Sequence, residues 1–110
     1  MTHHELCFGC GLANLFGLQM ELARDGDRVS GRFFAKQDHQ GADGTVHRGI
    51  LVVALEEALE HAGAEPRRVE VEFVAAAPIG SFLRVSASQS QAELRSDHGI
   101  VALAKVAEPG

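Results

Sequence analysis

Hydrophobic and polar residues alternate in four stretches of the chain, and a fifth stretch is apolar almost throughout. Strict alternation is the pattern of a strand with one covered face, and a short apolar run is typical of a strand covered on both faces. The predicted strands cover residues 18–22, 29–35, 69–73, 83–88 and 100–106. Asp25-Gly26 is a turn signal between the first two, which therefore form a hairpin.

A helical period replaces the alternation between Gly49 and Ala62. At about 100° per residue, the apolar side chains form one wide stripe along this helix. The stripe consists of Leu51, Val52, Ala54, Leu55, Ala58, Leu59 and Ala62. Glu56 falls at its margin. The remaining polar residues, Glu57, Glu60 and His61, lie off it. Gly63 and Pro66 are expected to end the helix.

The predicted order of elements is therefore β-β-α-β-β-β, within one domain that spans residues 1–110. The helix is mostly apolar and must be buried, and the amphipathic strands need something to cover. A curved antiparallel sheet wrapped around one central helix satisfies both demands, which places the chain in the α+β class. The open edges of such a sheet favour a homodimer or a homotetramer.

Composition excludes several classes of function. Ten Lys and Arg residues against 15 Asp and Glu give a net charge of −5. This balance argues against nucleic-acid binding and against binding to anionic membranes. No signal peptide is visible, and the longest apolar stretch, residues 50–55, is far too short to cross a membrane. The two cysteines do not form a secreted disulfide framework, so we expect a protein of the reducing cytoplasm.

Those two cysteines, Cys7 and Cys10, lie close to His3 and His4. Thiolate and imidazole are the ligands that zinc prefers in structural sites. Such a site normally needs a second Cys or His pair elsewhere in the chain, and the sequence offers no obvious one. We therefore expect the cysteines to be reduced and free of metal, in a packing turn of small residues.

The strongest local signal is the glycine-rich segment 41–49, which runs directly into the apolar helix. The first N–H groups of a helix have no internal acceptor and carry partial positive charge, so they suit a carbonyl oxygen or an oxyanion. Glu56 lies two turns further along, where partial burial would make its carboxylate more basic. The ordinary alternatives to these functional roles are that Glu56 is a solvated residue on the helix surface and that His47 only caps the helix.

Three segments resemble the hotdog-fold acyl-CoA thioesterases, in the phenylacetic-acid-degradation type and its relatives. The first is Cys7-Phe8-Gly9-Cys10-Gly11 with Asn14 and Gly17-Leu18. The second runs from His39-Gln40-Gly41 to Val46-His47-Arg48-Gly49-Ile50, and the third is Leu55-Glu56-Glu57-Ala58. Phe73 and Pro78-Ile79-Gly80 also resemble the strand and turn that follow in the family.

This resemblance implies the hotdog fold and hydrolysis of an acyl-CoA without a cofactor. It implies that Glu56 activates water or attacks the thioester, and that the backbone N–H of Arg48, with Gly49 and His47 beside it, polarises the carbonyl. Gln40 and Gly41 lie where the family contacts substrate, and the family's sites lie between two subunits. Arg48 replaces a glycine that is usual there. The alternative is a hotdog protein that binds an acyl-CoA, or another small ligand, without hydrolysing it.

Overall fold

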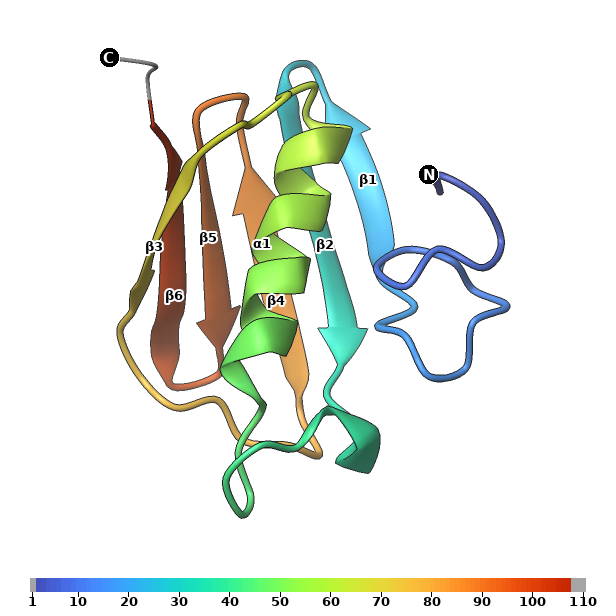
Figure 1. The fold of residues 1–110 in the computed structure, drawn as a ribbon, viewed down its shortest axis with the longest axis vertical. Coiled ribbons are helices and arrows are strands. Elements are labelled where there is room, and N and C mark those ends of the chain that lie inside the picture. Colours follow the sequence, from blue (N-terminus) through green and yellow to red (C-terminus); the bar gives the residue numbers. More distant parts are fainter. Residues whose placement is uncertain (1, 108–110) are drawn as a thin grey trace.

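A six-stranded antiparallel sheet curves around a single α-helix in the computed structural model, which describes residues 2–107 (Figure 1). The elements in chain order are β1 (Glu21–Asp25), β2 (Arg28–Phe34), a 3-10 turn (Gln37–His39), α1 (Arg48–His61), β3 (Val69–Phe73), β4 (Phe82–Ala87), β5 (Gln91–Ser96) and β6 (Gly99–Val106). The sheet order is β1-β2-β4-β5-β6-β3, and each neighbouring pair is antiparallel. Strands β1 and β3 are therefore the edges.

The expected curved sheet around one helix is confirmed, but the prediction of five strands is wrong. The sixth strand, β5, pairs with β4 and β6 in the middle of the sheet. Its buried residues, Ala92 and Leu94, alternate with polar ones, so the strand signal was present. The turn before it contains neither Gly nor Pro. Ser88 closes that turn instead, donating its N–H to the Gln91 carbonyl at 2.8 Å.

The first strand begins later than its alternation predicts, at Glu21 instead of residue 18. Gln19 has φ of +50°, which interrupts an extended strand. Leu18 and Met20 are buried all the same, because their N–H groups bond to the carbonyls of Phe8 and Gly9 in the N-terminal segment. The alternation thus marks burial correctly but not sheet pairing.

Helix α1 packs its apolar stripe against β2, β4, β5 and β6. Leu51, Ala54, Leu55, Ala58 and Leu59 are at most 2% exposed. Gly63 follows the helix with φ of +95°, a conformation that glycine adopts without strain, so the predicted end is confirmed. No helix in residues 2–107 combines the length and the apolar character needed to cross a membrane.

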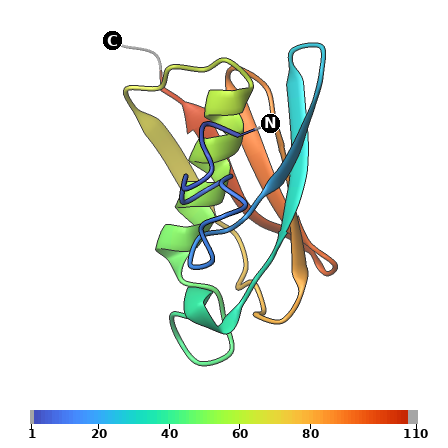
Figure 2. The same ribbon diagram turned by 90° about the vertical axis from the view of Figure 1, so that its right-hand side faces the viewer.

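The N-terminal segment, residues 2–20, lies across the side of α1 near β1 (Figure 2). Buried His39 holds it to the rest of the domain, with Nε2 against the Gly17 carbonyl at 3.2 Å and Nδ1 accepting from the Lys36 N–H at 3.1 Å. Burial lowers the pKa of His39, so the neutral ring that these bonds require is favoured. This segment covers a part of the helix that the sheet leaves open.

Candidate functional site

The loop before α1 is held in shape by a short ladder of backbone bonds. Gln40 pairs with Val46, and its side-chain Oε1 accepts from the Gly44 N–H at 3.0 Å. Thr45 bridges to Pro78, which ties the loop to the turn before β4. Gln40, an expected substrate contact, therefore shapes the loop in this chain.

Gly41 is required by close packing. A Cβ on this residue would lie 2.9 Å from the His47 Cα and 3.1 Å from its Cβ. Real Cβ atoms essentially never lie within 3.0 Å of a backbone atom, so only glycine lets the two ends of the loop approach this closely. Packing of the loop therefore explains why the motif has glycine at position 41.

A cleft of about 560 Å³ opens where this loop meets the start of α1. It is bounded on its other side by the end of edge strand β3 and the residues that follow. Its lining consists of Gly41, Ala42, Thr45, Val46, His47, Arg48, Leu51, Phe73, Val74, Ala75, Ala76 and Ala77. The structure thus brings together three of the expected site residues, Gly41, His47 and Arg48, whereas Gln40, Gly49 and Glu56 are not in the lining. The sequence carries no motif that marks residues 74–76 as part of a site.

Two expected backbone donors at the helix start differ in availability. His47 is the N-cap residue, and its Nδ1 accepts from the Gly49 N–H at 2.9 Å. This bond occupies one of the helix-start donors. Within residues 2–107 the Arg48 N–H has no hydrogen-bond acceptor. Arg48 therefore offers the free donor beside the cleft, and His47 fixes the turn that presents it.

The Arg48 side chain lies over the Phe73 ring, with its guanidinium carbon 4.6 Å from the ring centroid. This contact is a cation–π interaction and forms part of the cleft wall. Gln19 is the only non-glycine residue with positive φ in residues 2–107, so the substitution of arginine for glycine at position 48 causes no backbone strain.

Glu56 differs from its expected environment. Its position at the margin of the apolar stripe predicts partial desolvation, whereas its side chain is exposed on a single chain. Eight residues separate it from Arg48, a rise of about 12 Å along the axis. One chain therefore cannot bring the Arg48 N–H and the Glu56 carboxylate to the same carbonyl group. A site that uses both needs a second chain.

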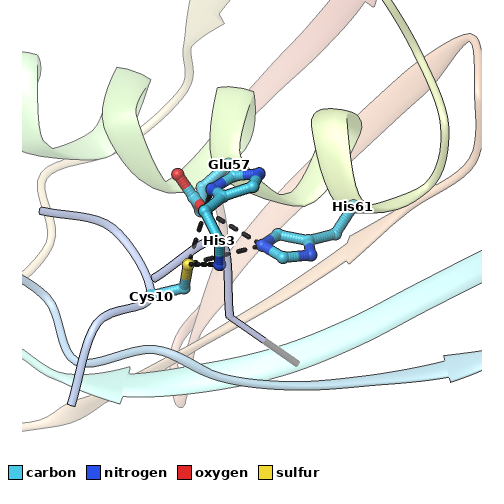
Figure 3. Close-up of side chains that lie close together, drawn as sticks. All are labelled: His3, Cys10, Glu57 and His61. Carbon is cyan, nitrogen blue, oxygen red and sulfur yellow. Dashed lines mark hydrogen bonds and ion pairs between the residues drawn. The ribbon is translucent and has the colours of Figure 1, made fainter. Parts of the chain in front are cut away.

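The neighbouring Glu57 is the buried carboxylate of the helix, only 8% exposed. It meets His61 of the same helix and His3 and Cys10 of the N-terminal segment (Figure 3). The Cys7 thiol of the same segment also lies 3.7 Å from its carboxylate oxygens. The sequence offers no obvious second pair of potential metal ligands near the cysteines. The structure brings Glu57 and His61, which are four residues apart on one helix face, into contact with them.

The two thiols of this cluster differ. Burial and a hydrogen bond to Glu57 raise the pKa of Cys10 to about 12, which makes it a poor nucleophile in the metal-free protein. Burial also raises the pKa of Cys7. However, hydrogen bonds from His3 and from the N–H groups of Cys10 and Gly9 outweigh it and hold that pKa below its ordinary value.

Comparison with known proteins gives matches in structure alone. No family model and no curated protein matches the sequence. The Escherichia coli PaaI protein, from the phenylacetic acid degradation operon, superposes with a TM-score of 0.74 at 15% identity, over 80% of both chains. A mutant of PaaI from Thermus thermophilus gives 0.70 at 18% identity, over 79% of this chain and 89% of that one.

A further match is a thioesterase superfamily protein, with a TM-score of 0.70 at 15% identity. It covers 84% of this chain, but this chain spans only 53% of that protein's length. These likenesses confirm the hotdog fold that the sequence resemblance implied, which is the fold of thioesterase superfamily structures.

Proposed function

We propose that the protein hydrolyses an acyl-CoA thioester to a free acid and coenzyme A in the cleft at the start of α1. The observation that carries this proposal is the unpaired Arg48 N–H beside a cleft of about 560 Å³. A free helix-start donor stabilises the oxyanion that forms when a thioester carbonyl is attacked. Apolar lining residues such as Leu51, Phe73 and Val74 suit an acyl chain.

The carboxylate for this reaction is Glu56 of a second subunit, acting as general base on water or as nucleophile. An exposed glutamate is a weak base on one chain, but an interface would desolvate it and raise its basicity. Edge strand β3 runs directly into the cleft lining, so a partner that pairs there would lie beside the site. His47 holds the helix start, and Gly41 and Gln40 shape the loop on the substrate side.

The assembly follows from this arrangement. Sedimentation velocity of the purified protein at micromolar concentration is expected to show a homodimer or a homotetramer, because each site requires two chains. A single species with the mass of one chain, under conditions where the protein hydrolyses acyl-CoA, would contradict the shared site.

The activity itself is tested by a screen of short-chain, long-chain and aromatic acyl-CoAs, with release of the free thiol as the signal. We expect at least one class to be hydrolysed well above the rate without protein.

A second candidate function is binding of an acyl-CoA without hydrolysis, which is favoured by the Gly49 N–H being held by His47. Calorimetric binding of coenzyme A with no turnover of any acyl-CoA would support that candidate and refute hydrolysis. We place the protein in the cytoplasm, where acyl-CoA is available.

A further inference from the structure

Five metal-ligating side chains meet on the side of α1 that faces away from the cleft. Glu57 lies nine residues after Arg48, which at about 100° per residue is half a turn around the helix. Arg48 faces β3 through Phe73, whereas Glu57 faces the N-terminal segment. The cluster is therefore separate from the proposed thioesterase site and plays no part in it.

The donor atoms of the cluster lie close enough together to share one ion, and the shortest contact is the direct pair of His3 Nδ1 and Glu57 Oε2 at 2.9 Å. His61 Nε2 lies 3.4 Å from Cys10 Sγ and 3.1 Å from Glu57 Oε2, and His3 Nδ1 lies 3.6 Å from Cys10 Sγ. Zinc bonds of about 2.0 to 2.3 Å at tetrahedral angles require about 3.4 Å between N and O ligands and about 3.6 Å between N and S ligands. His3, Cys10, Glu57 and His61 each offer one ligand atom, and these four atoms all lie within 4.8 Å of one another.

Cys7 adds a fifth potential donor beside these four ligand atoms. Its sulfur lies 3.5 Å from His3 Nδ1 and 3.7 Å from each Glu57 oxygen. Figure 3 shows the two histidine rings and the Cys10 sulfur converging on the Glu57 carboxylate, from the N-terminal segment on one side and α1 on the other.

The charge of the cluster favours a cation. In residues 2–107 the ion pairs of Glu57 are with His3 and His61 alone, and neither Lys nor Arg takes part. A buried carboxylate is costly unless positive charge or hydrogen bonds compensate it. One thiolate and one carboxylate together balance a divalent ion, with both imidazoles neutral.

The N-terminal loop is shaped to bring its donors this close. A Cβ on Gly9 would lie 2.5 Å from Glu57 Oε1, and a Cβ on Gly11 would clash with the backbone of Glu5 and Cys7. Glycine at both positions lets the loop fold tightly against the helix. The His3 N–H also donates to Cys10 Sγ at 3.2 Å, the kind of bond that stabilises a thiolate ligand.

We propose that this cluster is a structural site for one zinc ion. The four ligands are His3, Cys10, Glu57 and His61, and Cys7 lies beside them without binding the ion. Binding forms one Zn–S bond at Cys10, whose thiol proton passes to solvent. Thiolate and imidazole ligands select zinc over magnesium or calcium, which require oxygen ligands. Four protein ligands leave no open position, so the ion fixes residues 3–10 on α1 and does no chemistry.

The test is zinc retention by the reduced protein. The wild-type chain and two single variants, Cys10→Ser and His61→Ala, are loaded with zinc chloride in the presence of a non-thiol reductant, and then dialysed. We expect one equivalent of zinc per chain to remain on the wild type and at most a tenth of that on either variant. His98→Ala is the matched control, because His98 is exposed and lies outside the cluster. It should retain zinc like the wild type, and zinc should raise Tm in those two proteins alone.

A second measurement needs no variant and therefore does not depend on whether the substitutions fold. Cobalt(II) added to the metal-free wild type should give a thiolate-to-cobalt charge-transfer band and the intense visible bands of a tetrahedral site. Weak octahedral bands without charge transfer would overturn the proposal. Failure of the wild type to retain zinc, or equal retention by the His61→Ala and His98→Ala variants, would also overturn it.

Discussion

Replacing Arg48 with proline is expected to lower kcat for acyl-CoA hydrolysis by at least ~10²-fold, the usual cost of losing one oxyanion donor. Proline has no backbone N–H, so the change removes the only helix-start donor that lines the cleft and lacks an acceptor in residues 2–107. Side-chain substitutions cannot test a backbone donor in this way.

The fold should survive this change for two reasons. Arg48 is the first residue of α1, a position where proline is favoured because the N–H has no helical acceptor. His47 has φ of −59° and ψ of 136°, the extended conformation that a residue before proline prefers. Circular dichroism and thermal unfolding should therefore match the wild type closely.

Arg48→Ala is the matched control. It keeps the N–H and removes the guanidinium that lies over Phe73. Its kcat should stay within ~10-fold of the wild type, since the transition-state donor remains. Equal losses of kcat in the proline and alanine variants would mean that the side chain matters and the backbone donor does not.

Glu56→Gln is expected to lower kcat by at least ~10²-fold, the lower range for a positioned general base. Glutamine keeps the size of the side chain and its hydrogen-bonding capacity but cannot accept the proton of water. Affinity for coenzyme A, measured by calorimetry, should change by less than about twofold, because the carboxylate acts on the thioester and not on the coenzyme.

The matched control is Glu60→Gln, one turn further along α1 and also exposed. It carries the same change of charge on the same helix, so any general electrostatic effect should appear in both variants. Full activity in the Glu56→Gln variant, or an equal loss in both, would remove Glu56 from the mechanism.

Periodicity placed the helix to within one residue at each end, because its apolar stripe, Gly63 and Pro66 all indicate the same limits. It missed β5 because the turn at residues 88–90 relies on serine hydrogen bonds and carries neither Gly nor Pro. Local signals thus predict an element well when its boundaries are marked by residues with strong backbone preferences.

The candidate site was predicted only in part, for a physical reason. The glycine-rich loop, His47 and Arg48 are adjacent in the sequence, so their grouping at the cleft follows from local structure. Glu56 was expected to be partly buried and Glu57 to lie off the apolar stripe, but in the structure Glu56 is exposed and Glu57 is buried. Periodicity shows which side chains share the apolar stripe, but it does not show that the N-terminal segment covers the helix on another side and buries Glu57 there.

The cysteine cluster shows the same limit of spacing arguments. Cys10 and His61 are 51 residues apart, and nothing local predicts that they meet. One signal was available, since Glu57 and His61 are four residues apart and therefore share a helix face. That pair, read together with a Cys-x-x-Cys segment, indicates a second half for the metal site.

The central claim is that each catalytic site joins the helix start of one chain to Glu56 of another, and subunit complementation tests it most directly. The Glu56→Gln and Arg48→Pro chains are each nearly inactive in our account. Unfolding them together and refolding the equimolar mixture should restore about a quarter of the wild-type rate, since half of the dimers are mixed and each mixed dimer has one intact site. A mixture that stays as inactive as its parents, although mass spectrometry shows mixed dimers, would contradict the claim.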